Sequence, residues 1–205
     1  MNTDSVCRAL ESCFGPLFKY GLVVLASVLF ASCGYMAPNR GAVVSVKDQK
    51  LAVFNRGQVV KTYPVSTSKF GLGDRRGSGR TPLGRMKVAK KIGGGAPAGA
   101  VFKSRKRTGE VLPVNAPGRD PIVTRIMWLR GMEFVNRNAF SRYIYIHGTP
   151  EERKIGRPAS YGCIRMKSKD IIDLYRRLRV GEEVKVVTHS LDRYEQTEPL
   201  KNIGG

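Results

Sequence analysis

The sequence predicts a mainly β, sandwich-like domain with one short helix that follows Cys163. Two observations carry this prediction. Short runs of β-branched and aromatic residues recur along the chain between turn signals, and only one late segment places apolar residues at helical spacing. Many short strands with a single late helix are typical of a layered β architecture rather than of alternating β–α units.

Strand signals open the domain. Residues Val43–Val46 and Lys50–Phe54 are short β-prone runs, and a turn at Asn55-Arg56-Gly57 leads to a third predicted strand at Gln58–Ser66. Residues 67–84 carry five glycines and a proline, which indicates a long surface loop with a function or with mobility of its own. Strand alternation returns at Arg85–Lys91.

A second irregular stretch, residues 93–121, contains a Gly-Gly-Gly run and several prolines. It also carries a basic cluster, Lys103, Arg105, Lys106 and Arg107. Short charge runs are most often solvated faces, so a solvated loop is the first interpretation and a patch that binds the cell wall is the second.

The second half contains the central strands and the helix. Ile122–Leu129 and Tyr143–His147 are strongly β-prone. The helix is predicted at Ser168–Arg179, with Ser168 as the N-cap and Gly181 just beyond the end. Val184–Val187 is a closing strand, and residues 189–205 form a polar C-terminal tail.

Length and charge limit the function. A chain of 205 residues is long enough for one catalytic core and a leader, but short for two enzyme domains. The formal net charge of +20 predicts attraction to polyanions: nucleic acid, acidic lipid or an anionic wall polymer. Charge alone does not choose among these partners.

The N-terminus favours export. Gly21–Ala31 is an apolar run of eleven residues between Lys19 and a Ser-Cys-Gly end. At about 1.5 Å per residue it is too short to cross about 30 Å of hydrocarbon. It has the form of an export signal, and Phe30-Ala31-Ser32-Cys33 resembles a bacterial lipoprotein processing site, where the cysteine is lipidated. The alternatives are a plain signal peptide or a buried N-terminal helix.

This interpretation divides the chain into four parts: an export signal at 1–32 with lipidation at Cys33, a tether at 33–42, a folded domain at 43–188 and the tail at 189–205. Removing residues 1–32 takes away two basic and two acidic residues, so the charge belongs to the exported part. We therefore expect an envelope or periplasmic location, membrane attachment through lipid, and contact with anionic wall polymers or lipid head groups. Nucleic acid is not an expected partner.

Cysteine usage isolates one thiol. Cys7 and Cys13 leave with the leader and Cys33 carries lipid, so Cys163 is the only free thiol of the mature protein. A single unpaired cysteine in an oxidising compartment has no disulfide role. It is either a small buried hydrophobic residue or a reactive group.

His147 is the partner expected for that thiol. His147-Gly148-Thr149-Pro150 ends a predicted strand, and Ser160-Tyr161-Gly162-Cys163-Ile164-Arg165-Met166 precedes the helix. A cysteine nucleophile needs a base, and histidine is best matched to that task near neutral pH. Gly162 leaves room for a substrate carbonyl beside the backbone. Taken singly, a packed cysteine or a hydrogen-bonded histidine is the commoner role, and the ligands are too few for a structural zinc site.

These two segments resemble the signature of the L,D-transpeptidase catalytic domain, the YkuD-like family. The likeness extends upstream through Ser45–Lys91, with Pro64-Val65-Ser66-Thr67 and Thr81-Pro82-Leu83-Gly84-Arg85, and covers roughly residues 43–188. At one position the chain departs from the family pattern, because Tyr161 stands where a histidine is common. That histidine is not the family's general base, so the departure bears on substrate positioning or oxyanion geometry.

The resemblance implies a role for each motif residue. Cys163 is the nucleophile, His147 the base, and the Gly148 carbonyl holds the imidazole in the correct tautomer. The amides of Tyr161, Gly162 and Cys163 form the oxyanion hole, and Ser160 shapes the loop. Arg165 either binds a stem-peptide carboxylate, lowers the pKa of the thiol, or forms a structural ion pair.

The implied reaction joins peptidoglycan stem peptides without a metal or cofactor. Cys163 attacks the third residue of a tetrapeptide stem, expels D-alanine and leaves a thioester that an amine resolves. If water resolves it, the enzyme is an L,D-carboxypeptidase. The alternative from another class is a non-catalytic, basic wall-binding lipoprotein, in which Cys163 need not have a low pKa.

Overall fold

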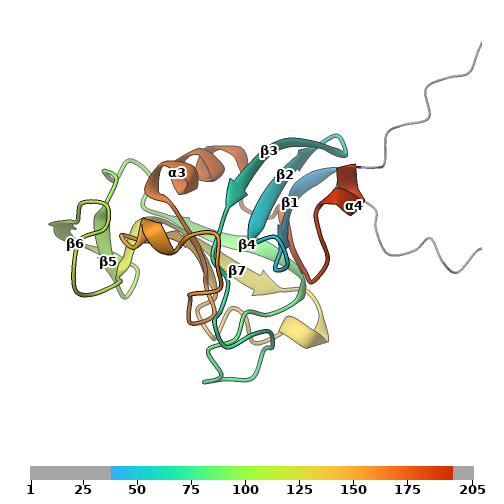
Figure 1. Ribbon diagram of the computed structural model, residues 1–205, viewed down its shortest axis with the longest axis horizontal. Helices are drawn as coiled ribbons and strands as arrows, with labels where there is room; N and C mark the ends of the chain where they lie inside the picture. Colours follow the sequence, from blue (N-terminus) through green and yellow to red (C-terminus); the bar gives the residue numbers. More distant parts are fainter. Residues whose placement is uncertain (1–37, 196–205) are drawn as a thin grey trace, which may run out of the picture. The chain divides into compact units, whose positions relative to one another are not determined.

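The computed structural model describes residues 38–195, and these form one curved sheet with few helices (Figure 1). The predicted mainly β class is confirmed. Within the described residues no helix has the length and apolar character that crossing a bilayer requires. The leader, Cys33 and the last ten residues lie outside the described part. The strands are β1 (Arg40–Ser45), β2 (Lys50–Asn55), β3 (Gln58–Pro64), β4 (Gly84–Ile92), β5 (Ala100–Lys103), β6 (Lys106–Val111), β7 (Ile122–Gly131), β8 (Tyr145–Gly148), β9 (Ile164–Met166) and β10 (Glu183–Val187).

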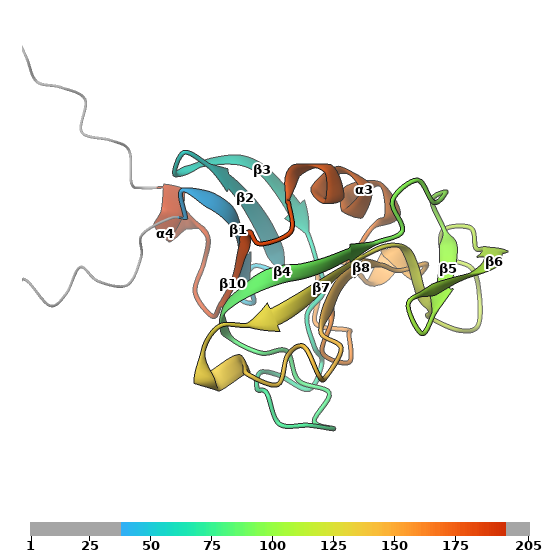
Figure 2. The same cartoon turned by 180° about the vertical axis from the view of Figure 1, so that it is seen from behind.

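The sheet runs in the order β3-β2-β1-β10-β4-β7-β5-β6, and β8 pairs with both β7 and β9. The early strands form antiparallel hairpins, whereas the last strand, β10, returns beside β1 in parallel register. This return places the end of the domain between its first strand and β4 (Figure 2). The β8–β9 pair is also parallel, and it carries the two motifs that the sequence singles out.

The core explains why these segments form strands. Alternate residues of β1 enter different clusters: Val44 packs in the main core with Leu174 of the helix, and Val43 packs in a second cluster with Phe54. Strands buried on both faces read as continuous apolar runs, as β1 does. The main core takes residues from β1, β2, β3, β4, β7, β8, β9, β10 and the helix, so the sheet curls around it.

The helix α3 (Ser168–Arg177) covers this core, with Ile171 and Leu174 fully buried. The predicted end at Arg179 is two residues too late. The predicted N-cap is also wrong: Lys167 is the N-cap, and Ser168 is the first helical residue. The Ser168 hydroxyl instead contacts Thr124 Oγ1 at 2.8 Å, because it faces the buried side of the helix. The other helices are η1 (Phe134–Asn136), η2 (Glu152–Lys154) and α4 (Asp192–Glu195).

Three strands lie outside the predicted set. The stretch 93–121, expected to be irregular, contains the hairpin β5–β6, and the cysteine motif continues into the short strand β9. The strand predicted from Tyr143 begins at Tyr145, and Tyr143 itself has a positive φ of 59°. The predicted third strand ends at Pro64.

Candidate active site

The Cys163 thiol opens into a surface depression. Cys163 directly precedes β9 and is partly exposed, and its Sγ donates a hydrogen bond of 3.4 Å to the Tyr143 carbonyl. The depression has a volume of about 290 Å³. The thiol is therefore held on one side and accessible to a ligand on the other. The lining residues are Arg76, Gly77, Gly79, Ser141, Arg142, Ile144, Tyr161 and Cys163.

His147 lies on the neighbouring strand β8, and its side chain is only 6% exposed. Its Nδ1 is 2.8 Å from the Gly148 carbonyl oxygen. A carbonyl oxygen only accepts, so Nδ1 carries the proton and Nε2 of the neutral ring has the free lone pair. Burial lowers the pKa of His147, which keeps the imidazole neutral.

The parallel register of β8 and β9 brings the two motifs side by side. His147 pairs with Arg165 across the strands, so Cys163 lies just ahead of the same strand pair. Among the described residues no hydrogen bond joins the thiol to the imidazole. Position 148 requires glycine, because the Cβ of any other residue would lie 2.6 Å from the Val123 carbonyl oxygen on β7.

Burial also raises the pKa of the Cys163 thiol, to about 11. A hydrogen bond from the Tyr145 backbone and the charges of Arg142 and Arg165 lower it, but desolvation outweighs them. The low thiol pKa that we expected of an active enzyme is therefore not a property of this resting state. Thiol and imidazole are both neutral here.

Arg165 is a buried ion-pair residue, with 3% of its side chain exposed. It contacts the carboxylates of Asp120 and, at 3.3 Å, Glu151. Its Nε and Nη2 have no hydrogen-bond partner within residues 38–195. Of the three roles considered for Arg165, the contacts favour the structural ion pair, with a secondary effect on the pKa values of the thiol and the imidazole.

Asp120 is a site residue that the sequence did not single out. It accepts a 2.5 Å hydrogen bond from Thr149 Oγ1 and pairs with Arg165, and its charge raises the pKa of His147 against the effect of burial. It precedes β7 at the end of an irregular stretch, where one carboxylate among several polar residues gives no sequence signal.

Gly162 lies against the loop at 67–84. Its φ is +118°, a conformation that favours glycine, and an added Cβ would lie 3.2 Å from the Arg80 carbonyl oxygen. The missing side chain therefore makes room for the loop at 67–84. The Gly162 N–H donates at 3.2 Å to Ser160 Oγ, which itself donates at 2.5 Å to the Cys163 carbonyl.

The loop at 67–84 docks on the cysteine motif at several points. Thr81 Oγ1 donates to the Gly162 carbonyl at 3.0 Å, and Ser160 exchanges backbone hydrogen bonds with Thr67 and Lys69 at 3.0 and 3.1 Å. Thr81 is fully buried. The long glycine-rich loop is thus part of the site's framework, and Thr81 is a second positioning residue that sequence reasoning missed.

Tyr161 turns toward the same loop. Its side chain is 69% exposed, its hydroxyl accepts a 3.0 Å hydrogen bond from Lys69 Nζ, and Lys69 Nζ lies 4.4 Å from its ring centroid. The Phe70 ring centroid is 5.5 Å away. None of these contacts involves His147 or Cys163. Tyr161 is one of the residues that line the depression containing Cys163.

The second histidine lies apart from this arrangement. The His189 carbonyl accepts a hydrogen bond from Ser45 Oγ, and its ring packs against Tyr194 beside α4. Within residues 38–195 no group of three or more His, Cys, Asp or Glu side chains is arranged to hold a metal ion.

Comparison with known proteins shows similarity to L,D-transpeptidases. The model of the L,D-transpeptidase catalytic domain, YkuD, matches residues 39–186. A probable L,D-transpeptidase, YcfS of Escherichia coli, is 26% identical over 74% of this chain and 45% of its own length. The putative L,D-transpeptidase YkuD of Bacillus licheniformis is 24% identical over 70% of this chain and 62% of its own.

Among solved structures, the catalytic domain of the E. faecium L,D-transpeptidase matches 75% of this chain and 100% of that domain, at 17% identity and a TM-score of 0.46. The chain spans less than two thirds of the length of the two curated relatives. The family model, however, covers most of the described residues, including both motifs. The chain belongs to the L,D-transpeptidase catalytic domain family.

Proposed function

We propose that this protein is a cysteine-dependent peptidoglycan L,D-transpeptidase in which Cys163 is the nucleophile and His147 the base. One observation carries the proposal: the Gly148 carbonyl fixes the His147 tautomer, while Cys163, directly before the adjoining strand β9, opens into a depression. A fixed tautomer leaves Nε2 as the proton acceptor, and the depression gives a peptide access to Sγ.

In the first step His147 Nε2 takes the thiol proton as Sγ attacks the carbonyl carbon of the third stem residue. The tetrahedral intermediate collapses when the bond to the terminal D-alanine breaks, and the imidazolium returns its proton to the leaving amine. A thioester to Cys163 remains. Because burial disfavours a free thiolate, the proton leaves Sγ as the S–C bond forms and not before it.

In the second step an acceptor amine gives a proton to His147 and attacks the thioester carbon. The new amide forms as the C–S bond breaks, and the thiolate recovers the proton. A stem-peptide amine gives a cross-link, a protein amine gives an attachment, and water gives L,D-carboxypeptidase activity. The reaction needs no cofactor, since nucleophile, base and oxyanion donors all belong to the chain.

The oxyanion is assigned to backbone N–H groups of the cysteine loop. Because the Gly162 N–H donates to Ser160 Oγ, we assign this role first to Tyr161 and Cys163. Ser160 acts as a positioning residue, since its hydroxyl joins the Gly162 amide to the Cys163 carbonyl.

The N-terminal segment and the net charge bear on the location and the partners of the protein. We propose export by residues 1–32, lipidation at Cys33 and a location in the periplasm or cell envelope. The predicted tether to residue 42 extends too far into the fold, because β1 begins at Arg40. The predicted tail at 189–205 begins too early, because Leu191 and Tyr194 pack in a core cluster of the catalytic domain expected at 43–188. The net charge of +20 supports contact with anionic wall polymers or lipid head groups near the substrate.

The test is a turnover assay with the full chain, a synthetic tetrapeptide donor and an amine acceptor, followed by mass spectrometry. We expect D-alanine release, a thioester on the Cys163 peptide and an amide product. Cys163→Ala abolishes all three, and His147→Gln slows thioester formation by about 10²- to 10⁴-fold. Tripeptide without amide product would identify the carboxypeptidase, and no donor processing at all would favour the non-catalytic wall-binding alternative.

A further inference from the structure

Three arginines on the loop at 67–84 lack an acidic partner. Arg75, Arg76 and Arg80 are exposed, and no ion pair formed within residues 38–195 includes them. The neighbouring carboxylate of Asp74 is committed elsewhere: it pairs with the buried Arg142 at 3.0 Å and accepts from the Asn138 N–H at 2.6 Å. The loop therefore displays uncompensated positive charge.

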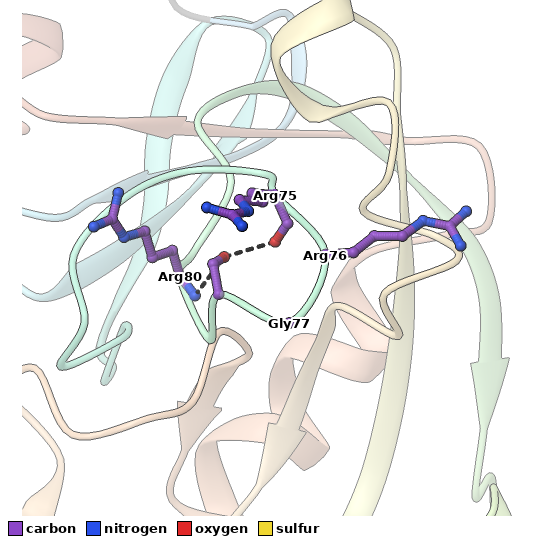
Figure 3. Close-up of a pocket in the computed structure, with 5 residues that line it drawn as sticks. Arg75, Arg76, Gly77 and Arg80 are labelled. Carbon is purple, nitrogen blue, oxygen red and sulfur yellow. Dashed lines mark hydrogen bonds between the residues drawn. The ribbon is translucent and has the colours of Figure 1, made fainter.

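Backbone and hydroxyl contacts hold this loop in shape. Ser78 Oγ donates to the Arg75 carbonyl at 2.7 Å and accepts from the Arg80 N–H at 3.3 Å, as Figure 3 shows. Arg142 Nη2 donates to the Arg80 carbonyl at 2.7 Å from the body of the domain. These contacts use main-chain atoms of Arg75 and Arg80 and leave their guanidinium groups available to a ligand, whereas the Arg76 guanidinium has a long contact of 3.5 Å with Ser141 Oγ.

The arginines line a depression of about 440 Å³ together with Gly77 and Ser78. Arg76 and Gly77 also line the depression that contains Cys163, so the two hollows share a wall. In Figure 3 the Arg76 side chain points away from Arg75 and Arg80. It reaches toward Ser141, whose Oγ lies 3.5 Å from Arg76 Nη2 and which lines the Cys163 depression.

We propose that Arg76 anchors a carboxylate-binding subsite for the peptide that occupies the Cys163 depression, and that Arg75 and Arg80 add positive charge from the adjoining hollow. This inference rests on the proposed function. Guanidinium groups bind carboxylates through paired, charge-assisted hydrogen bonds. Stem peptides whose carboxylates are free are preferred over those in which the carboxylates are converted to carboxamides.

Continuity with the Cys163 depression favours a peptide carboxylate over the phosphate of a wall polymer. An anion held by Arg76 lies beside the nucleophile, where the reacting peptide must be. Arg142, the other arginine that lines the Cys163 depression, is neutralised by Asp74. Arg76 is thus the cation of that depression without an acidic partner among the described residues.

The test measures binding to Cys163→Ala protein, in which no turnover occurs. Calorimetry compares a tetrapeptide stem whose carboxylates are free with the fully amidated peptide. Two triple variants lose the same charge: Arg75→Gln/Arg76→Gln/Arg80→Gln, and a control, Lys169→Gln/Arg176→Gln/Arg179→Gln. The control residues lie on and just after α3 and line neither depression.

We expect the loop variant to weaken binding of the free-carboxylate peptide by about tenfold or more, and to leave the amidated peptide unchanged. The control variant should change neither. Equal losses in both triple variants, or equal losses for both peptides, would overturn the inference. So would a loop variant that loses only affinity for polyphosphate.

A separate measurement distinguishes this failure from failure of the proposed function. If the wild-type protein forms the Cys163 thioester but the loop variant binds and turns over both peptides normally, the subsite is refuted and the transpeptidase stands. If the wild-type protein binds neither peptide and forms no thioester, both are refuted.

Discussion

Burial acts on the thiol and the imidazole in the same sense, toward the neutral form. It raises the pKa of Cys163 to about 11 and lowers the pKa of His147 below its usual value. A neutral pair differs from the thiolate–imidazolium pair that other cysteine enzymes maintain at rest.

The neutral pair predicts the pH dependence of Cys163 alkylation. The rate constant for iodoacetamide modification, followed at the Cys163 peptide by mass spectrometry, should rise about tenfold per pH unit from pH 7 to pH 10, because the thiolate fraction does so below the thiol pKa. His147→Gln should leave this profile unchanged. A plateau below pH 8 that His147→Gln removes would instead indicate a resting ion pair.

The buried ion pair of Arg165 predicts a stability difference between two acid-to-amide changes. Asp120→Asn leaves a buried guanidinium with Glu151 alone and should reduce the free energy of unfolding by about 3 kcal/mol. Glu110→Gln breaks the exposed pair with Arg119 and should cost less than about 1 kcal/mol. Urea unfolding of both variants tests this, and equal losses would show that the Arg165 pairing is not a stabilising element.

At the scale of elements, the strand pair β8–β9 and the loop at 67–84 make the site together. The first places His147 and the cysteine motif side by side, and the second closes on the motif through Thr81 and Ser160. The loop leaves so little space that the motif needs glycine at position 162.

This close contact predicts different outcomes for two glycine substitutions. Gly162→Ala and Gly156→Ala both place alanine at a positive φ, +118° and +96°, and each should cost about 1–3 kcal/mol of stability. The new Cβ at position 162 would lie 3.2 Å from the Arg80 carbonyl oxygen. The new Cβ at position 156 would have no neighbour within 4 Å. Gly162→Ala should therefore slow Cys163 acylation by an order of magnitude or more, and Gly156→Ala should not. Equal acylation rates would show that the loop contact does not position the thiol.

The sequence predicts an element correctly where the spacing of its apolar residues and the turn residues at its ends indicate the same structure. The first three strands, β4, β7, β10 and α3 follow from β-prone runs, turns and helical spacing. It does not reveal β6, whose residues are all exposed, or β9, which is three residues long. Both exist because a neighbouring strand supplies their hydrogen bonds, and a single sequence does not show that neighbour.

The candidate site, like the fold, could be predicted from the sequence only in part. His147, Gly148 and the cysteine motif stand out by chemistry, and the structure places them together, although their roles stay predictions. Asp120 and Thr81 act through contacts between segments distant in the sequence, and Arg165 and Gly162 have contacts that spacing alone did not reveal. The neighbours of a motif residue depend on contacts with segments that are distant in the sequence, and a single sequence does not show those contacts.

At the scale of the whole molecule, the charge of +20 predicts a salt-sensitive attachment to the wall. Binding of the full chain to purified anionic sacculi, measured by co-sedimentation, should fall steeply as salt rises from about 0.05 M to about 0.5 M, because screening shortens the reach of surface charges. Binding that is indifferent to salt would contradict an electrostatic attachment and indicate recognition by shape or by apolar contact.

The central claim is that Cys163 is an acylatable nucleophile served by His147. The most direct measurement is mass spectrometry of the full chain after incubation with a carbapenem, with peptide mapping and with Cys163→Ala and His147→Gln beside it. The account predicts one adduct, confined to the Cys163 peptide, absent from Cys163→Ala and formed much more slowly by His147→Gln. A folded wild-type protein that forms no adduct, or an adduct that persists in Cys163→Ala, would contradict it.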